Sequence, residues 1–345
     1  MTMETLFAQA SERGASDLHL VVGLPPIIRL HGELKPLDEA VLTPKKMEEL
    51  IGSLLQPAQQ ARFAKERELD ISYQSKDGTR FRINLHYEKD NLGLVARVIP
   101  TTIPSLEDIG MPEVVSALTR MDYGLVLVTG PTGCGKSTTL AAMIKLINSE
   151  RALNIITLED PIEFIFKPNK SIIKQRQLGT DMISFAEGLK HTLRQDPNVI
   201  MVGEMRDLET IATTLTLAET GHLVLATLHT SNAAQTIDRI IDVFPPHQQT
   251  QIRLQLSFSL KAVISQRLLP KEVGGRIAAR ELLLNNAAVA NLIRENKIAQ
   301  IRSVIQTSAE EGMITMDQHI KHMMLDQIIS RETALAHVSS PDVLR

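Results

Sequence analysis

The chain has 345 residues, 43% apolar and 22% charged, which is ordinary globular usage and enough for about two domains. Lys and Arg total 37 against 40 Asp and Glu, and aromatic residues make up 3%, which argues against a nucleic-acid-binding protein. The single cysteine, Cys134, excludes an internal disulfide. The first residues lack the features of a secretory leader, and no apolar run is long enough for a membrane span, so we expect a cytoplasmic protein.

Residues 1–99 are predicted to form a mixed α/β domain. A helix is expected from Thr43 to Leu55, because Pro44 stands at a first-turn position that tolerates proline. Alternating or continuous apolar runs predict strands over residues 17–22, 27–30, 69–73, 79–87 and 93–99. The proline-containing segment 100–105 is predicted to link this domain to the next.

Residues 106–345 follow a different pattern, in which short apolar runs alternate with amphipathic stretches. Strands are predicted over residues 125–129, 154–158, 199–202 and 223–227. Helices are predicted over residues 136–148, 185–194, 207–219 and 233–241. This alternation indicates a parallel sheet covered by helices on both faces. After Pro245 and Pro246 the sequence is predicted to be mostly helical, apart from a short return to a strand-like pattern over residues 274–284.

The strongest motif lies between the first strand and the first helix of the second domain. Residues 130–137, GPTGCGKS, match the phosphate-loop pattern G-x-x-x-x-G-K-[ST] in full. In this pattern, glycines let main-chain N–H groups face phosphate oxygens at a helix N-terminus. Lys136 would reach the β- and γ-phosphates, and Ser137 would bind Mg²⁺. The residues expected to contact the nucleotide are Gly130, Pro131, Thr132, Gly133, Cys134, Gly135, Lys136, Ser137 and Thr138.

Cys134 allows two interpretations. A thiol near a helix N-terminus acquires a lower pKa and is suited to redox sensing. The simpler interpretation is that this position of the loop accepts a small side chain.

Two groups of acidic residues follow strands of the predicted sheet. Glu204 follows the strand 199–202, and the cluster 159–163 follows the strand 154–158. The carboxyl ends of parallel strands form the ligand crevice, so these acids are expected to face a metal ion or the attacking water. ATP hydrolysis needs a positioned water and charge neutralisation, and either Glu163 or Glu204 would orient that water. The competing interpretation of Glu204 is a solvated surface acid.

Taken in order, the motifs of this chain resemble those of the type IV pilus retraction (PilT-like) ATPases of the secretion-type ring ATPase superfamily. The resemblance covers essentially the whole chain. It rests on residues 15–20, 80–84, 130–139, 158–164, 202–210, 218–222, 227–230 and 236–240.

The resemblance implies a hexameric ATPase that uses ATP and Mg²⁺ to drive pilus retraction. Each subunit would pair an N-terminal PAS-like α/β domain with a C-terminal RecA-like P-loop domain, which has a mostly parallel sheet and a helical C-terminal region. The expected location is the inner face of the cytoplasmic membrane at the pilus base. The expected partners are five further copies of the chain, an inner-membrane platform protein and a paralogous retraction ATPase, with membrane association only through partners.

By the same resemblance, Glu163 is the catalytic glutamate, and Glu204 is the Walker B acid that shares the metal with Ser137. His222 and His229 match the histidine box, which senses the γ-phosphate or couples it to the subunit interface. A structural role is the alternative for each histidine.

Arg82 and Arg97 match N-terminal-domain arginines that close onto the nucleotide. The planar guanidinium group stays charged and grips phosphate oxygens with two hydrogen bonds, which suits this task. Solvated surface arginines are the alternative.

Two positions depart from the family pattern. Ala290 stands where the family motif has Arg, and Asn198 stands where Asp is usual. These departures leave open an accessory retraction paralogue. Further alternatives are an assembly or type II secretion ATPase, a DNA-translocating ATPase of the same core fold, and an ATP-binding ring protein without catalysis.

Overall fold

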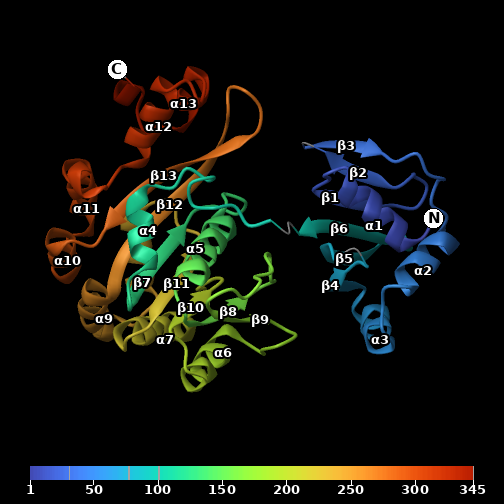
Figure 1. Cartoon of the computed structure of the whole chain (residues 1–345), viewed down its shortest axis with the longest axis horizontal. Helices are drawn as coiled ribbons and strands as arrows, with labels where there is room; N and C mark the ends of the chain where they lie inside the picture. The colour runs from blue at the N-terminus through green and yellow to red at the C-terminus, as the bar shows by residue number, and fades with distance from the viewer. Residues whose placement is uncertain (31, 77, 100–101, 345) are drawn as a thin grey trace. The chain divides into compact units, whose positions relative to one another are not determined.

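In the computed structural model, residues 1–30, 32–76, 78–99 and 102–344 are described. The chain divides into two compact units, Met1–Thr102 and Ile103–Arg345, and each is treated by itself (Figure 1). Of the predicted linker 100–105, residues 100 and 101 lie outside the described residues. Among the described residues, no helix is both long enough and apolar enough to cross a membrane.

The first unit is built on a six-stranded antiparallel sheet in the order β3-β2-β1-β6-β5-β4. Its strands are β1 (Asp17–Leu20), β2 (Ile27–Leu30), β3 (Glu33–Pro36), β4 (Glu68–Gln74), β5 (Arg80–Glu88) and β6 (Asn91–Ile99). Its helices are α1 (Met3–Glu12), α2 (Pro44–Gly52) and α3 (Pro57–Glu66).

One face of this sheet packs against the helices to form the core of the first unit. Leu18 and Leu20 of β1 are fully buried in it, and the rings of Phe7 and Phe81 stack with centroids 4.2 Å apart. The hydroxyl of Thr43 accepts a hydrogen bond from the N–H of Lys46 and so caps α2. The helix therefore begins where the sequence predicts it.

The second unit contains a seven-stranded sheet in the order β13-β12-β7-β11-β10-β8-β9, parallel except for β13. The strands are β7 (Gly124–Thr129), β8 (Asn154–Glu159), β9 (Ile172–Gln177), β10 (Val199–Val202), β11 (Leu223–Leu228), β12 (Leu260–Pro270) and β13 (Arg276–Leu284). The helices are α4 (Glu113–Thr119), α5 (Lys136–Glu150), α6 (Phe185–Thr192), α7 (Leu208–Glu219), α8 (Ala233–Asp242), α9 (Pro246–Ser259), α10 (Ala287–Arg294), α11 (Ile301–Thr307), α12 (Met316–Leu325) and α13 (Arg331–His337).

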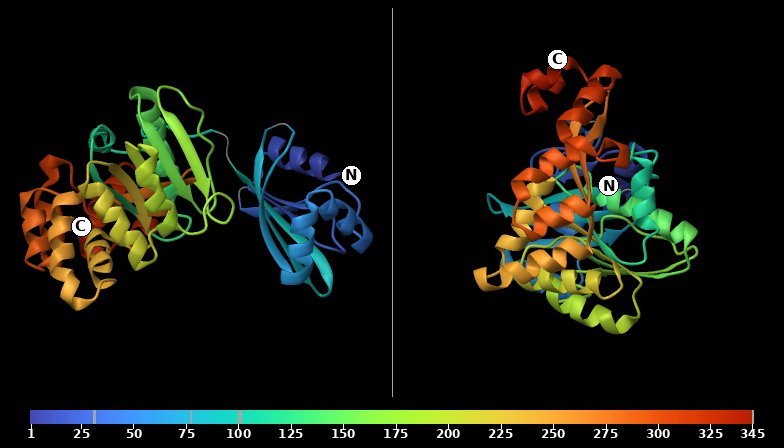
Figure 2. Two further views of the ribbon diagram at one scale, coloured as in Figure 1. Left: turned by 90° about the horizontal axis from the view of Figure 1, so that it is seen from below. Right: turned by 90° about the vertical axis from the view of Figure 1, so that its left-hand side faces the viewer.

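Helices cover both faces of this sheet (Figure 2). Val126 and Val128 of β7 pack into the cluster with α4 and α5. Leu125 and Leu127 pack into the opposite cluster, which includes apolar residues of α6 through α11. Because β7 is buried on both faces, its sequence is continuously apolar rather than alternating. The predicted α/β class is confirmed.

The structure differs from the sequence prediction at residues 260–270. The segment was expected to be helical, but it forms β12, which pairs in parallel with β7 and antiparallel with β13. Most of β12 is buried, so the segment lacks the alternation that distinguishes a strand from a buried helix. It also follows α9 directly, without a glycine or proline to mark the boundary.

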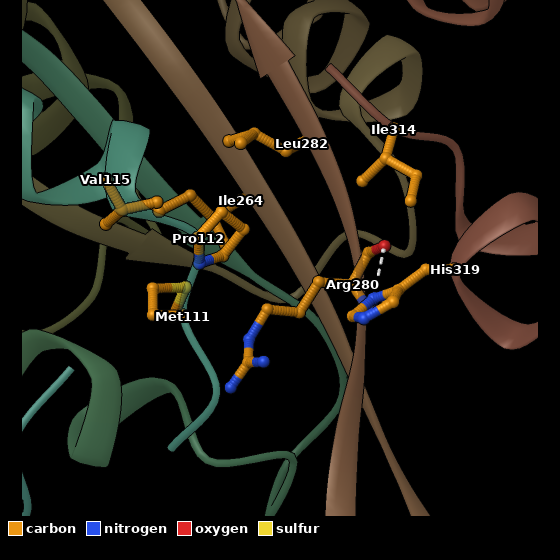
Figure 3. Close-up of a pocket in the computed structure, with 8 residues that line it drawn as sticks. All are labelled: Met111, Pro112, Val115, Ile264, Arg280, Leu282, Ile314 and His319. Carbon is orange, nitrogen blue, oxygen red and sulfur yellow. Dashed lines mark hydrogen bonds between the residues drawn. The ribbon is translucent and has the colours of Figure 1, made fainter. Parts of the chain in front are cut away.

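A small, mostly apolar cavity of about 60 Å³ lies between α4, β12, β13 and α12 (Figure 3). Two nitrogen-bearing side chains, Arg280 and His319, line it, and the main-chain N–H of Arg280 donates to Nδ1 of His319 at 2.8 Å. Burial lowers the pKa of His319 from 6.5 to about 4, with the positive charge of Arg280 contributing. His319 is therefore neutral in the fold at neutral pH, as its acceptor role requires.

This predicts an acid-sensitive contribution to stability. The unfolded chain binds a proton at His319 near pH 6.5 and the folded chain only near pH 4, so the stability present above pH 6.5 is lost as the pH falls toward 4. Replacing His319 by Gln should remove about 2 kcal/mol of the difference in unfolding free energy between about pH 7.5 and about pH 4.5. Urea unfolding of the parent and His319→Gln at both pH values measures it.

The matched control is His247→Gln, at an exposed position of α9. An equal pH dependence in the parent and His319→Gln would contradict the prediction.

Candidate active site

Four parallel strands of the second unit end at one edge of the sheet. Thr129 of β7 lies beside Leu228 of β11, and Val202 of β10 lies between Ala226 of β11 and Leu158 of β8. The segments that follow these strands therefore emerge at the same edge. They carry the phosphate loop, His229, Glu204 and Glu163, so the fold brings these predicted residues to one site.

The phosphate loop needs its glycines for two physical reasons. Gly130, Gly133 and Gly135 have φ angles of 138°, 77° and 92°, which side-chain-bearing residues rarely adopt. A Cβ on Gly130 would also lie 2.3 Å from the main-chain oxygen of Gln266 and 2.7 Å from Sγ of Cys134. The loop leads directly into α5, which begins at Lys136. This is the geometry of an anion site at a helix N-terminus.

Lys136 folds over the loop. Its ammonium group donates to the carbonyl oxygens of Gly130 at 2.8 Å and Pro131 at 3.1 Å. Burial lowers the pKa of Lys136, and the negative charges of Glu163 and Glu204 act in the opposite direction. The lysine and both carboxylates are therefore close enough to interact electrostatically, as a site for the phosphates of a nucleotide requires.

Glu204 is largely enclosed at this edge of the sheet. Its side chain is 15% exposed; Oε1 lies 2.7 Å from Nε of Arg206, and Oε2 lies 3.6 Å from Nε2 of His229. The preceding Gly203 donates its N–H to the oxygen of Leu158 at 2.8 Å and accepts the hydroxyl of Thr227 at its own carbonyl. A Cβ on Gly203 would lie 3.0 Å from the oxygen of Leu158. Strand contacts on both sides thus fix the chain at Glu204.

The two glutamates of the acidic cluster have different environments. Glu159 is buried and accepts hydrogen bonds from the hydroxyl of Thr157 at 2.6 Å and the amide of Gln175 at 3.0 Å. Burial raises the pKa of Glu159. Glu163 lies exposed in the loop beyond it. Of these two glutamates, only Glu163 presents its carboxylate to solvent beside the phosphate loop.

The structure does not bring His222 to this edge. His222 precedes β11, and its carbonyl oxygen accepts the N–H of Gly124 at 3.0 Å, at the start of β7. Its Nδ1 lies 3.1 Å from the oxygen of Leu217. The whole length of β11 separates it from His229. A role of His222 in nucleotide chemistry stays a prediction, and within one subunit it cannot act by direct contact with the phosphates.

Arg82 and Arg97 belong to the first unit. They lie opposite each other on β5 and β6, exposed on the sheet face that does not form the core. Nε of Arg97 donates to Oδ1 of Asp17 at 2.9 Å, and Arg29 lies 3.9 Å from the same carboxylate. The three arginines therefore extend in a row across β2, β6 and β5, with one carboxylate between two of them.

Comparison with known proteins identifies the family. Residues 93–275, more than half of the chain, match the family of type II/IV secretion system proteins. The chain belongs to this family. It is 45% identical over 342 residues to the type IV pilus retraction ATPase PilT of Pseudomonas aeruginosa, covering 99% of both chains. It is 40% identical to the type IV pilus ATPase PilU of the same organism, covering 100% of this chain and 91% of PilU.

Solved structures agree with this assignment. A crystal structure of the pilus retraction motor PilT with bound ADP has a TM-score of 0.94 and 45% identity, over 99% of this chain and 98% of that one. The ATPase DotB of Legionella pneumophila has a TM-score of 0.85 and 28% identity, over 97% and 95%. The predicted resemblance to the retraction ATPases and the predicted ATPase activity are confirmed. The enzyme is a P-loop ATPase.

Sequence reasoning missed two residues that this site uses. Arg206 pairs with Glu204, and Gln266 of β12 contacts the phosphate loop from the protein interior. Arg206 was detectable, since it stands two residues after Glu204. Gln266 was not, because the strand that carries it was not predicted.

The structure favours the simpler interpretation of Cys134. The side chain is buried, and burial raises the pKa of its thiol, although Lys136 acts in the opposite direction. Less thiolate is present at neutral pH than for a free cysteine, and reagents have no access to it. Cys134 therefore fills space beneath the loop.

We expect Cys134 in the folded enzyme to react with a disulfide reagent at least about tenfold more slowly than in the unfolded chain. Both burial and the raised pKa slow the reaction. Absorbance kinetics with Ellman's reagent, in buffer and in urea, measure the ratio, and the urea sample serves as the control because the chain has a single thiol. Equal rates would contradict the burial of this side chain.

Proposed function

We propose that this enzyme is a hexameric motor ATPase that drives type IV pilus retraction and twitching motility. The observation that carries the proposal is the whole-chain similarity to PilT together with the convergence of Lys136, Glu163 and Glu204 at one sheet edge. We place it at the inner face of the cytoplasmic membrane at the pilus base. There it would act on an inner-membrane platform protein and reach the membrane only through partners.

The residues at the edge fit a magnesium ion. Mg²⁺ prefers oxygen ligands and commonly takes one or two from the protein, with phosphates and waters completing the octahedron. The hydroxyl of Ser137 at the start of α5 and the carboxylate of Glu204 would supply the protein ligands. When bound, the ion would neutralise charge on the β- and γ-phosphates.

Glu163 and Glu204 would have different roles in hydrolysis. Glu204 is enclosed and held by Arg206 and His229, which suits a carboxylate that keeps a fixed position at the metal. Glu163 is exposed in its loop, which suits a carboxylate that accepts a proton from the attacking water. We therefore assign Glu163 as the catalytic base, and Lys136 to the phosphates.

The arginines and histidines would couple the chemistry to movement. Arg82 and Arg97 of the first unit would close onto the nucleotide and release it after hydrolysis, a hinge movement driven by contacts that exist in only one state. His229 contacts Glu204 and would report the state of the γ-phosphate. His222, at the other edge of the sheet, would act at a subunit interface.

A second candidate function is that of an accessory retraction ATPase working with a paralogous motor. The observation that favours it is Ala290 of α10, which replaces the Arg of the family motif; the chain also matches PilU over its whole length, at 40% identity. The phosphate chemistry is the same in both candidates.

The assignment of the two glutamates has a direct test. Glu163→Gln should bind ATP and Mg²⁺ normally and lose at least about 100-fold in kcat, because only proton transfer is removed. Glu204→Gln should also raise the Mg²⁺ concentration needed for half-maximal turnover. Steady-state ATPase assays across a magnesium titration measure both. A normal magnesium requirement in Glu204→Gln would contradict the assignment of Glu204 to the metal. An altered magnesium requirement in Glu163→Gln would contradict the assignment of Glu163 to proton transfer alone.

The direction of the motor is tested in cells whose only copy carries Lys136→Ala, with the exposed Lys35→Ala as control. Loss of the ammonium removes phosphate binding and should leave excess surface pili without twitching. Electron microscopy of pili and a twitching assay measure this. Normal pilus numbers would indicate the accessory role, and cells without pili would show that the motor drives assembly.

A further inference from the structure

Gln266 is a buried polar residue in the middle of β12. Its exposed fraction is 2%, and Ile264 and Ser265 before it are fully buried. Burying an amide costs free energy unless its donors and acceptors find partners. Both ends of this amide find partners around the phosphate loop.

The two hydrogen bonds of the side chain reach the phosphate loop and the helix that follows it. Nε2 of Gln266 donates to the carbonyl oxygen of Cys134 at 3.2 Å, within the loop. Oε1 accepts the hydroxyl of Thr139 at 2.7 Å, in the first turn of α5. The bond to Cys134 fixes which way the amide faces, since a carbonyl oxygen only accepts and therefore selects the amide nitrogen, which leaves Oε1 for the hydroxyl of Thr139.

The bond to Cys134 sets the direction of one peptide group of the loop. In a trans peptide, the C=O of one residue and the N–H of the next point in opposite directions. Because the oxygen of Cys134 points inward at Gln266, the N–H of Gly135 points away from the interior. A glycine with φ of 92° has little intrinsic resistance to a flip of this peptide, so the hydrogen bond must supply it.

The main chain of Gln266 acts on the other end of the loop. A Cβ on Gly130 would lie 2.3 Å from its carbonyl oxygen, so the loop begins in direct contact with β12. Beside it, the hydroxyls of Thr129 and Ser265 are 2.8 Å apart. β12 therefore supports the loop along its inner side.

We propose that Gln266 is a positioning residue for nucleotide binding, which holds the Cys134–Gly135 peptide with its N–H directed at the phosphates. It does not touch the nucleotide itself. Without it, the peptide turns its carbonyl dipole toward the phosphates and repels them. This inference rests on the ATPase activity and is independent of the pilus role.

The experiment measures binding of MgADP to the purified full chain by titration calorimetry, with KM and kcat for ATP. Gln266→Met, which keeps the length of the side chain and removes both bonds, should weaken MgADP about tenfold and raise KM more than it lowers kcat. Thr139→Val should give an effect in the same direction, and Thr139→Ser should recover most of the loss. In the double variant, Gln266→Met with Thr139→Val, the losses should not add.

The matched control is Asn285→Leu. The amide of Asn285 donates to the oxygens of Ser257 and Leu260 near the opposite end of β12, so its loss removes two similar hydrogen bonds away from the loop. It should lower the melting temperature and leave the MgADP affinity of the folded enzyme unchanged.

An unchanged MgADP affinity in folded Gln266→Met, or an equal loss in Asn285→Leu, would overturn the inference. Should Gln266→Met fail to fold, the pair Thr139→Val and Thr139→Ser decides, because equal affinities in the two would overturn it as well. ATP turnover by the parent enzyme tests the ATPase activity separately from these differences.

Discussion

The parallel pairing of β7, β11, β10 and β8 is the constraint on which the site depends. Parallel register places the ends of these strands side by side, so the residues that follow them meet although they are far apart in sequence. Lys136, Glu163 and Glu204 come from three different strand ends, and no local structure could bring them together. Burial of β7 on both faces anchors the strand between two apolar clusters, with Leu125 and Leu127 in one and Val126 and Val128 in the other.

The site also depends on polar groups inside an apolar sheet. Thr129, Thr157 and Gln266 are buried, and each makes a side-chain hydrogen bond at or next to the functional edge. Burying a polar group costs free energy, and this cost is offset only when the group makes its hydrogen bonds. Thr157 bonds to Glu159 of the acidic cluster, Gln266 bonds to Cys134 and Thr139, and Thr129 bonds to Ser265 beside the start of the loop, so interactions within the sheet also give the site its geometry.

The features that could be predicted from the sequence are those whose pattern lies within a few consecutive residues. The phosphate loop was predictable to the residue, because its glycines and Lys136 act over eight consecutive positions. The helix at Pro44 was predictable from its cap and its proline. β12 was not, since a buried strand shows no alternation. Gln266 and the opposite-edge position of His222 could be seen only in three dimensions, because both depend on which strands are neighbours.

In the first unit, the arrangement of charged side chains on the exposed sheet face lowers the stability of the sheet. Arg82 and Arg97 lie directly opposite each other on β5 and β6, and like charges in that position destabilise a sheet. Asp17, which is nearly buried, offsets part of this cost by pairing with Arg97 and Arg29. A fold under selection for stability alone would not place three arginines in one row with a single carboxylate among them. In the closure proposed above, a phosphate group near Arg82 and Arg97 would reduce this repulsion, and the difference in stability between the bound and free states would favour the closed state.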